Sequence, residues 1–435
     1  MTPDAPRRGP GTTTAARTAT GAGRWDGRLW ALLFILSGNM VLDAIEVSVV
    51  LVALPSIGAD LGMSPLTVQW LMSGFALGFA ALLPLGAWIT ARWGRRRAYL
   101  AAMAVFAAAS VAGGLADGPA LLIATRILKG LCAALTAPTG LAIISTTFRD
   151  GPDQRRAVSV YSLFGAAGFT VGALLSGALL EAGWRWTFLF PAPVALALML
   201  LGLRLLPPDP PDPPDPPDPP DAGAPAGPRP CLLRDGRLRR SALGAASLNG
   251  TYAGLLLLVT FQCQERFGWA PWKCALALLP ACVPLAVTVP FAGRLVARHG
   301  TARLVALGAL TPFAGCALYL WRPEGRPYAT GMLPVLLLVE AGFVLAFAAL
   351  NMQATATVPA ARRGRAVPLY QTGVQLGGVL TLPAVGALLT AHDGYRPALS
   401  LLTAVSAVGL VTAVAGLRAP APGAGTPDHH AQEAP

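Results

Sequence analysis

The sequence predicts an all-α membrane protein in which twelve transmembrane helices form two pseudo-symmetric six-helix bundles. The chain is strongly apolar: 54% of its 435 residues are hydrophobic and 12% are charged, whereas an ordinary soluble domain carries roughly 25% charged residues. The apolar residues fall into twelve runs of the length that crosses a bilayer. A sequence pattern from the first half also recurs in the second half.

Six apolar runs in the first half are each predicted to cross the membrane once, because about 20 apolar residues are needed to span the hydrocarbon core. These runs cover residues 29–54, 66–91, 98–116, 119–147, 157–180 and 186–206. The first run is longer than the core of a signal peptide, and Asp43 and Glu46 interrupt it. We therefore expect it to remain as a spanning helix.

Six further runs are predicted to form the second bundle, at residues 241–264, 271–296, 302–320, 328–357, 367–391 and 396–417. An even number of crossings places both chain ends on one side. Most of the 33 Lys and Arg residues fall on that side, and cytoplasmic loops retain such residues. We therefore expect a multi-pass protein of the cell (plasma) membrane with both termini in the cytoplasm. Since topology explains the basic residues, no nucleic-acid partner is expected.

An internal repeat relates the two halves. Its first copy consists of Arg156-Ala157-Val158, Tyr161 and Gly177-Ala178-Leu179-Leu180. Its second copy, 209 residues later, consists of Arg365-Ala366-Val367, Tyr370 and Gly386-Ala387-Leu388-Leu389. A parallel duplication around a central path is common among secondary transporters. The repeat therefore favours transport of a small molecule.

The halves are joined by five consecutive Pro-Pro-Asp triplets, from Pro207 to Asp221. Proline excludes a helix here, and polyproline II geometry has three residues per turn. The five aspartates would then share one edge: Asp209, Asp212, Asp215, Asp218 and Asp221. We predict that residues 207–240 are a spacer between bundles at 28–206 and 241–417. An alternative is that the acidic edge docks on basic cytoplasmic loops and biases a gate. The tails, 1–27 and 418–435, are expected to be disordered.

Charged side chains at membrane depth are the strongest functional signal. Asn39, Asp43 and Glu46 are spaced i, i+4, i+7 and so share one helix face, and Arg126 and Lys129 share a face of the fourth predicted helix. Such groups are costly in a membrane and face a wet cavity or a partner. One hypothesis is a structural ion-pair cluster. The other is proton coupling, since a carboxylate removed from water binds a proton more readily and loses it near a basic partner.

Further polar and soft side chains are candidates for the second half and for a substrate path. Glu340 is an isolated acid of the tenth run and a candidate for binding a proton or a cation, unless it lies near the membrane surface. The candidates for the path are Asn39, Trp70, Tyr161, Asn249, Tyr252, Gln262, Asn351, Met352, Gln371 and Gln375. Glycines of the fifth and eleventh runs are expected to allow close helix packing.

The sequence shows no constellation typical of an enzyme, a metal site or a cofactor site. The four histidines have no nucleophile or metal-ligand partner at useful spacing. The six cysteines form no Cys-x-x-Cys pair and are expected to be small buried hydrophobic residues. An alternative for Cys263 and Cys274, which flank a predicted outer loop, is a disulfide.

Several ordered motifs carry a resemblance to a known family. They are Ala53-Leu54-Pro55-Ser56-Ile57, Gln69-Trp70, Gly94-Arg95-Arg96-Arg97, Arg126-Ile127-Leu128-Lys129-Gly130, the Gly-rich run from Gly168 to Leu180, and Trp184-Arg185-Trp186. From about Asp43 to Pro191 the chain resembles the major facilitator superfamily, specifically its multidrug proton antiporters. In the second half, Gln264, Gly268, Pro280 and Gln375-Leu376-Gly377-Gly378 are also similar to that family.

The resemblance implies proton-coupled efflux of small, largely hydrophobic or cationic compounds by alternating access, with a protein that works as a monomer. Counting back from Ala53-Leu54-Pro55 places Glu46 where relatives carry their first-helix acid, so Glu46 is preferred to Asp43 as the proton carrier. The same resemblance assigns two cytoplasmic gate loops, with Arg92, Gly94, Arg95 and Arg96 in one and Arg298 and Gly300 in the other.

The chain departs from the family at four places. The acidic position of both gate loops is alanine, Ala91 and Ala297, and the Gly-Pro of the antiporter motif is Gly172-Ala173. Lys129 replaces a usual glutamine and could contact an anionic substrate. The linker stands where fourteen-span members have two extra helices. These departures leave two alternatives open: a proton-coupled importer of a metabolite such as an organic acid, and a carrier-like receptor or scaffold that does not transport.

Overall fold

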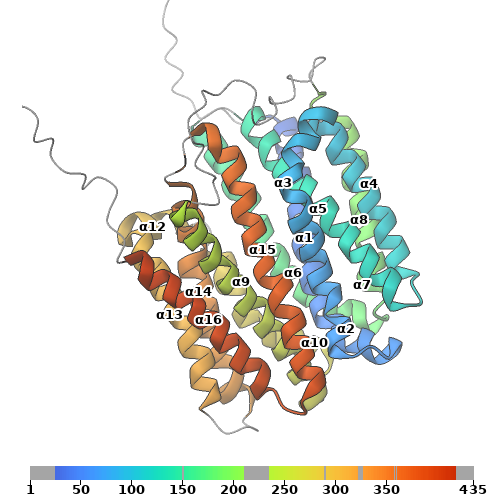
Figure 1. Ribbon diagram of the computed structural model, residues 1–435. Helices are drawn as coiled ribbons and strands as arrows, with labels where there is room; N and C mark the ends of the chain where they lie inside the picture. The colour runs from blue at the N-terminus through green and yellow to red at the C-terminus, as the bar shows by residue number, and fades with distance from the viewer. Residues whose placement is uncertain are drawn as a thin grey trace, which may run out of the picture.

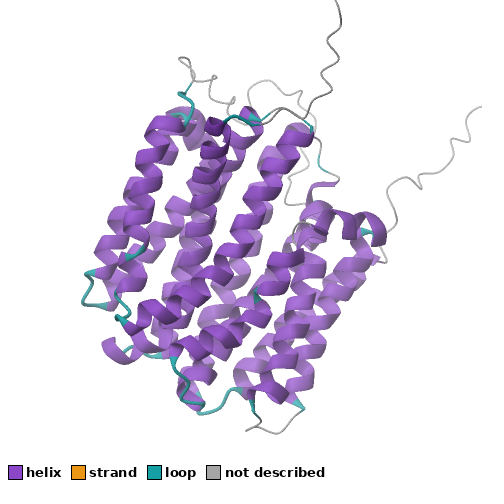
Figure 2. Cartoon of the chain, turned by 180° about the vertical axis from the view of Figure 1, so that it is seen from behind, coloured by secondary structure: helices purple, strands orange, loops and turns teal. Residues whose placement is uncertain are grey.

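The computed structural model describes residues 25–148, 151–209, 235–288, 291–321, 327–356, 358 and 360–417. Throughout these residues the regular structure is helical, with no strand, as Figure 2 shows. The prediction of an all-α protein is therefore confirmed. Nearly all of the two predicted disordered tails, and the linker from 210 to 234, lie outside the described residues.

Eight helices make up the described part of the first half. They are α1 (Gly27–Leu61), α2 (Pro65–Val68), α3 (Trp70–Trp93), α4 (Arg95–Gly114), α5 (Pro119–Thr147), α6 (Pro152–Glu181), α7 (Trp186–Leu189) and α8 (Pro191–Leu205). α1 ends at Leu61, and the next residue, Gly62, caps it with a φ of 61°, a left-handed conformation that glycine adopts easily. α2 begins after Ser64, whose hydroxyl accepts a hydrogen bond from the Thr67 amide and so satisfies a free N–H of the first turn.

The second half contains α9 (Gly236–Phe261), the π-turn η2 (Gln262–Arg266), α10 (Pro271–Leu278), the 3-10 turn η3 (Leu279–Ala281), α11 (Val283–Thr288), α12 (Ala292–His299), α13 (Thr301–Leu320), α14 (Tyr328–Ala356), α15 (Ala360–Ala391) and α16 (Arg396–Leu417). α9 begins five residues before the predicted boundary at 241. The reason is Asp235, whose carboxylate accepts hydrogen bonds from the amides of Arg237 and Leu238 and caps the helix earlier in the chain.

Eleven helical segments of the described residues are long and apolar enough to cross a membrane, and they match eleven of the twelve predicted runs. The exception is the predicted run 271–296, which the structure divides among α10, η3, α11 and α12. Pro280 and Pro284 lie inside this run. A proline inside a helix removes a backbone donor and clashes with the preceding turn, so an apolar run of sufficient length does not form one continuous helix here.

The hydrophobic core divides into three clusters. One contains buried residues of the first half only, such as Leu36, Tyr99 and Ile143. Another contains residues of the second half only, such as Leu248 and Tyr370. The largest is shared by both halves and includes residues of α1, α3, α9, α10 and α15. The two halves are thus packed against each other through one common core while each keeps a core of its own.

The shared core lies at one end of the bundle, near α2 and α10, which Figure 1 shows at the bottom. We call this the α2 end. The opposite end carries the last turn of α8, the first turn of α4 and α12 (Figure 1). We call it the linker end, because α8 leads from there into the linker.

The two copies of the repeat close the α2 end in the same way. A Cβ atom on Gly177 of α6 would lie 3.0 Å from Trp272 Cα at the start of α10, and one on Gly386 of α15 would lie 3.0 Å from the carbonyl oxygen of Pro65 in α2. A Cβ this close would require its neighbour to shift, so glycine favours the close approach of these helices. Each repeat glycine therefore packs against the opposite half, which is what a duplicated bundle with approximate two-fold symmetry requires.

Candidate functional site

A buried cluster of three charges lies inside the first half. The Glu46 carboxylate of α1 is 2.5 Å from Arg126 Nη1 and 2.5 Å from Lys129 Nζ, both on α5. The side chains of all three residues are fully buried. One carboxylate therefore binds two cations, one with each oxygen.

Close helix packing positions the two bases. A Cβ on Gly78 of α3 or on Gly130 of α5 would overlap the backbone of the facing helix, so these glycines bring α3 and α5 into direct contact. That contact places the Leu71 carbonyl oxygen 2.7 Å from Arg126 Nε and the Phe75 ring centroid 4.9 Å from the guanidinium carbon. Both contacts favour a positive charge, since an aromatic face and a carbonyl oxygen are electron-rich.

Lys129 is held between two aromatic rings. Its Nζ lies 4.9 Å from the ring centroid of Phe106 on α4 and 5.7 Å from that of Phe188 on α7. With Glu46 on α1, the ammonium group thus interacts with side chains from three other helices, α1, α4 and α7. A movement of any one of these helices changes the surroundings of the charge.

Each charge of the cluster depends on the others to offset the cost of its burial. Moving an ion out of water costs several kcal/mol even after relaxation, and removing one member of a buried pair strands the other. A further acid, Asp43, interacts electrostatically with both Glu46 and Lys129 and accepts a hydrogen bond from Asn39 Nδ2 at 3.3 Å. With Asp43 ionised, two acids and two bases balance. Among the described residues, Arg126 Nη2 has no hydrogen-bond acceptor.

These contacts agree with the shared faces that the spacing predicts. Asn39 and Asp43 lie one turn apart and bond to each other, and Arg126 and Lys129 bind the same carboxylate. Of the two acids, Glu46 makes the direct contacts. The geometry is an ion-pair cluster, and the proton-coupling role of its members stays a prediction.

Glu340 is buried in the middle of α14, with 1% of its surface exposed, so it does not lie at the surface of the protein. It is within electrostatic range of Tyr252 and Cys282. Tyr252 donates a hydrogen bond of 2.6 Å to the Ala281 carbonyl oxygen, and its ring lies 4.7 Å from that of Phe343. The second half thus has a buried acid of its own. It lies beside residues 271–296, which are divided among short helices and which we call the broken helix segment.

Besides Asn39 and Tyr252, three more of the predicted path residues have polar groups engaged within their own half. Tyr161 donates to the Ala137 carbonyl oxygen at 2.9 Å, Asn249 to that of Val374 at 3.0 Å, and Gln262 to the Tyr319 hydroxyl at 3.1 Å. Trp70, Asn351, Gln371 and Gln375 are half-buried, and Met352 is exposed. None of the ten residues lines the cavity described next, and their role in a substrate path stays a prediction.

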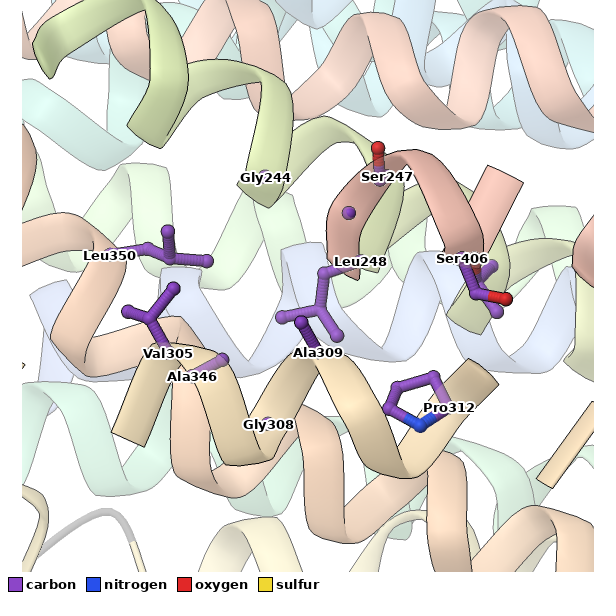
Figure 3. Close-up of a pocket in the computed structure, with 12 residues that line it drawn as sticks. Gly244, Ser247, Leu248, Val305, Gly308, Ala309, Pro312, Ala346, Leu350 and Ser406 are labelled. Atoms are coloured by element: carbon purple, nitrogen blue, oxygen red, sulfur yellow. The ribbon is translucent and has the colours of Figure 1, made fainter. Parts of the chain in front are cut away.

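A cavity does occur inside the second half, between α9, α13, α14 and α16 (Figure 3). Its lining is formed by small and apolar residues, among them Gly244, Ser247, Gly308, Ala346 and Gly409. This cavity was not predicted from the sequence. Small residues at helical spacing could have indicated the cavity, but such residues more often serve close helix packing.

The first gate loop holds the beginning of the linker. Asp209, the first aspartate of the Pro-Pro-Asp run, accepts hydrogen bonds from the amides of Arg96 at 2.8 Å and Arg97 at 3.3 Å. Arg96 Nη2 also donates to the Leu203 carbonyl oxygen at 2.5 Å. One aspartate of the run therefore binds backbone amides in the first turn of α4, and docking of the acidic edge on basic loops stays a prediction. The other four lie outside the described residues.

The two gate loops share one backbone geometry. Gly94 has φ 87° and ψ 147°, and Gly300 has φ 77° and ψ 153°. Both values of φ are positive, a region that glycine reaches without a steric cost. Arg92 stacks over Trp88 at 5.9 Å, while Arg95 and Arg298 are exposed. The duplication thus extends to the turns that follow α3 and α12.

The described residues include no group of three or more His, Cys, Asp or Glu side chains that could hold a metal ion.

Comparison with known proteins places these features in a family. The family model described as Major Facilitator Superfamily matches residues 36–382 and 286–434. The puromycin resistance protein pur8 of Streptomyces alboniger is 30% identical over 414 residues, which cover 83% of this chain and 82% of that protein. The tetracenomycin C resistance and export protein of Streptomyces glaucescens is 26% identical over 421 residues, or 85% of this chain and 77% of that protein.

A third relative covers less of the chain. The cephamycin export protein CmcT of Amycolatopsis lactamdurans is 34% identical over 258 residues, which are 59% of this chain and 46% of that protein. The family match spans most of the described helices, and the similarity to pur8 runs over most of both chains. The chain therefore belongs to the Major Facilitator Superfamily and is a multi-pass membrane transporter rather than an enzyme.

Proposed function

We propose that the protein exports small, largely apolar or cationic compounds, driven by protons that bind and leave Glu46, through alternating access between its two halves. The observation that carries this proposal is the fully buried Glu46–Arg126–Lys129 cluster in a transporter chain. The export direction is supported by relatives whose names include resistance and export.

The positive-inside rule supports a cytoplasmic linker end. Arginines cluster in the loop before α4 and near the start of α9, and both belong to that end of the bundle. Cytoplasmic loops retain such residues. In this orientation the shared core closes the outer end of the protein, an arrangement that exporters and importers both pass through.

The chemistry of the cluster explains how a proton could change the conformation. Protonation of Glu46 would weaken two ion pairs at once and leave Arg126 and Lys129 buried with less compensation. Because buried unpaired charges are costly, the helices that enclose the bases would favour an arrangement with more water or another partner. A membrane potential contributes about 2.3 kcal/mol per charge per 100 mV to such a cycle.

The test is efflux from cells or vesicles with a panel of dyes and antibiotics that includes puromycin. We expect accumulation of the exported compound to rise when the proton gradient is collapsed, and Glu46→Gln to abolish gradient-dependent efflux. Glu181→Gln is the matched control, since Glu181 is exposed at the end of α6. Efflux that survives loss of the gradient would rule out proton coupling.

A second candidate is import of an anionic metabolite. It is favoured by Lys129, a second buried cation on α5, and by the absence of an acceptor for Arg126 Nη2 among the described residues. Transport of organic acids measured in right-side-out and inside-out vesicles separates the two directions. A receptor or scaffold would show neither movement, and Glu46→Gln would leave its behaviour unchanged.

A further inference from the structure

The cavity of the second half lies at the centre of a ring of four helices. α13 packs against α14 and α16, and α9 packs against the same two helices. Leu248 of α9, Val305 and Ala309 of α13 and Leu350 of α14 surround the space, as Figure 3 shows. All the described residues that line it belong to these four helices, and all but Ala309 are buried. The cavity is therefore internal to the second half and separate from the Glu46 cluster.

Close helix contacts explain why the centre of the ring is empty. A Cβ on Gly308 of α13 would lie 2.6 Å from the Ala346 Cβ of α14, and one on Gly409 of α16 would lie 3.2 Å from the Ser247 Cβ of α9. Glycine allows the helices to approach at these places, but it provides no side chain for the space between them. The glycines that hold the ring together thus also leave its centre unfilled.

One polar group at the cavity has no partner. Thr251 of α9 lines the cavity and is fully buried. Its hydroxyl oxygen makes no hydrogen bond with the described residues. A threonine in a helix can donate to the carbonyl oxygen one turn earlier, as Thr260 of the same helix does to that of Leu256 at 2.8 Å. Because an unbonded buried hydroxyl is costly, a ligand that supplies the missing hydrogen bond is favoured here.

The lining limits the chemistry of a ligand. No charged residue is among the described residues that line the cavity, so nothing offsets the cost of burying a charged molecule. Of the two lining serines, Ser406 already donates to the Thr403 carbonyl oxygen at 2.8 Å. The cavity volume open to the centres of water-sized molecules is about 20 Å³, which leaves room for a small molecule and not for a large one. The site therefore suits a small neutral molecule that is largely apolar and carries one hydroxyl group.

The cavity lies close to the lipid-facing surface. Leu307 and Leu310 of α13 and Val408 and Val411 of α16 are exposed, and both helices are long and apolar enough to cross a membrane. In a membrane transporter, exposed apolar side chains of spanning helices face lipid. The same two helices line the cavity with their other faces. A molecule dissolved in the bilayer is thus separated from the cavity only by α13 and α16.

We propose that this cavity is a binding site for small neutral amphiphiles of the class of short-chain alcohols, which enter from the membrane. The Thr251 hydroxyl donates its hydrogen bond to the oxygen of the ligand. The carbon chain of the ligand lies among the apolar side chains of Leu248, Val305 and Leu350. Because every contact belongs to the second half, binding depends neither on the direction of transport nor on proton coupling.

The test is photolabelling of the full-length protein in liposomes with 3-azibutanol, a four-carbon alcohol that carries a diazirine. After irradiation, mass spectrometry of a digest locates the residues that have reacted. We expect adducts on residues of α9, α13, α14 or α16 that line the cavity, and a severalfold decrease of these adducts in an excess of 1-propanol. Adducts confined to lipid-facing side chains such as Val411, with no decrease in 1-propanol, would overturn the proposal.

Three variants separate the hydroxyl from the space. Thr251→Val keeps the side-chain volume and removes the hydrogen-bond donor, so labelling in the cavity should fall severalfold. Thr260→Val is the matched control on the same helix, since Thr260 does not line the cavity, and its labelling should equal that of the parent protein. Ala309→Leu should abolish the cavity adducts by filling the space. Equal labelling of the parent protein and Thr251→Val would contradict the site, and this comparison holds even where Ala309→Leu fails to fold.

Discussion

At the scale of single residues, the defining feature is that one carboxylate holds two buried cations. Of the three charged residues, Glu46 is expected to contribute most to the free energy of unfolding. The reason is that Glu46→Gln leaves both Arg126 and Lys129 without their shared partner. Removing one partner of a buried ion pair costs about 3–5 kcal/mol. Thermal unfolding of the purified protein in detergent measures this loss.

The double variant Glu46→Gln/Lys129→Gln separates charge balance from side-chain packing. It removes one acid and one base, so only Arg126 loses a partner. We expect Lys129→Gln to cost less stability in the Glu46→Gln background than in the parent protein, with a coupling of about 0.5–3 kcal/mol. Additive effects of the two substitutions would contradict the shared carboxylate.

The charged faces could be predicted from the sequence, and their pairing could not. The spacing of Asn39, Asp43 and Glu46 fixes a common face of α1, because helix geometry is local. Which acid meets Arg126 depends on how α1 is rotated against α5. That rotation is decided by close contacts elsewhere, such as Gly172 of α6 against Ile45. For the same reason the contact of Arg126 with the Leu71 carbonyl oxygen has no sequence signal.

At the scale of helices, Asp209 acts as a capping residue that is distant in sequence from the helix it caps. Its two oxygens accept the amides of Arg96 and Arg97 in the first turn of α4. Asp209→Ala is therefore expected to destabilise the protein by about 1 kcal/mol, the usual value for a lost N-cap. Asp209→Asn should cost less, because an amide oxygen can still accept one of the bonds.

Asp153→Ala provides the control for charge near a helix start. Asp153 lies in the first turn of α6, where an acid interacts with the helix dipole and contributes about 0.3–1 kcal/mol. Chemical denaturation of the three variants should rank Asp209→Ala as the most destabilised. An equal loss at both positions would mean that the bonds of Asp209 add nothing beyond its charge.

The broken helix segment shows that hydropathy alone does not predict a continuous helix. Residues 271–296 are apolar enough to predict a span, because that prediction counts side-chain polarity and not backbone donors. Pro280 and Pro284 lie at the division into α10, η3 and α11 and favour it, although α1 and α5 continue through a proline. At the same division, the Tyr252 hydroxyl donates a hydrogen bond to the carbonyl oxygen of Ala281.

At the scale of the whole molecule, the internal repeat predicted the architecture because it marks equivalent places in two bundles. Gly177 and Gly386 each contact the opposite half at the α2 end, and Gly94 and Gly300 make the same turn. The repeat could not predict which end is closed. Under the proposed alternating access both ends must be able to close, so the sequence would have to encode two arrangements, of which the structure shows one.

This packing leads to a prediction for the equilibrium between arrangements. A side chain at Gly386 would bring its Cβ to 2.8 Å from Gln69 Cγ and 3.0 Å from the Pro65 carbonyl oxygen, both of which belong to the opposite half. Gly386→Ala therefore opposes closure of the α2 end. Each 1.4 kcal/mol of added strain changes the ratio of the two arrangements by about tenfold, so the α2 end should open more often.

Thiol reactivity can measure that opening. Cys263 is buried at the α2 end, and we expect a membrane-impermeant maleimide to label it severalfold faster in Gly386→Ala than in the parent protein. Gly416→Ala is the matched control, because a Cβ at Gly416 of α16 would meet no atom within 4 Å. Unchanged labelling in a folded Gly386→Ala protein would show that this glycine contact does not hold the two halves together, and that the shared core alone closes the α2 end.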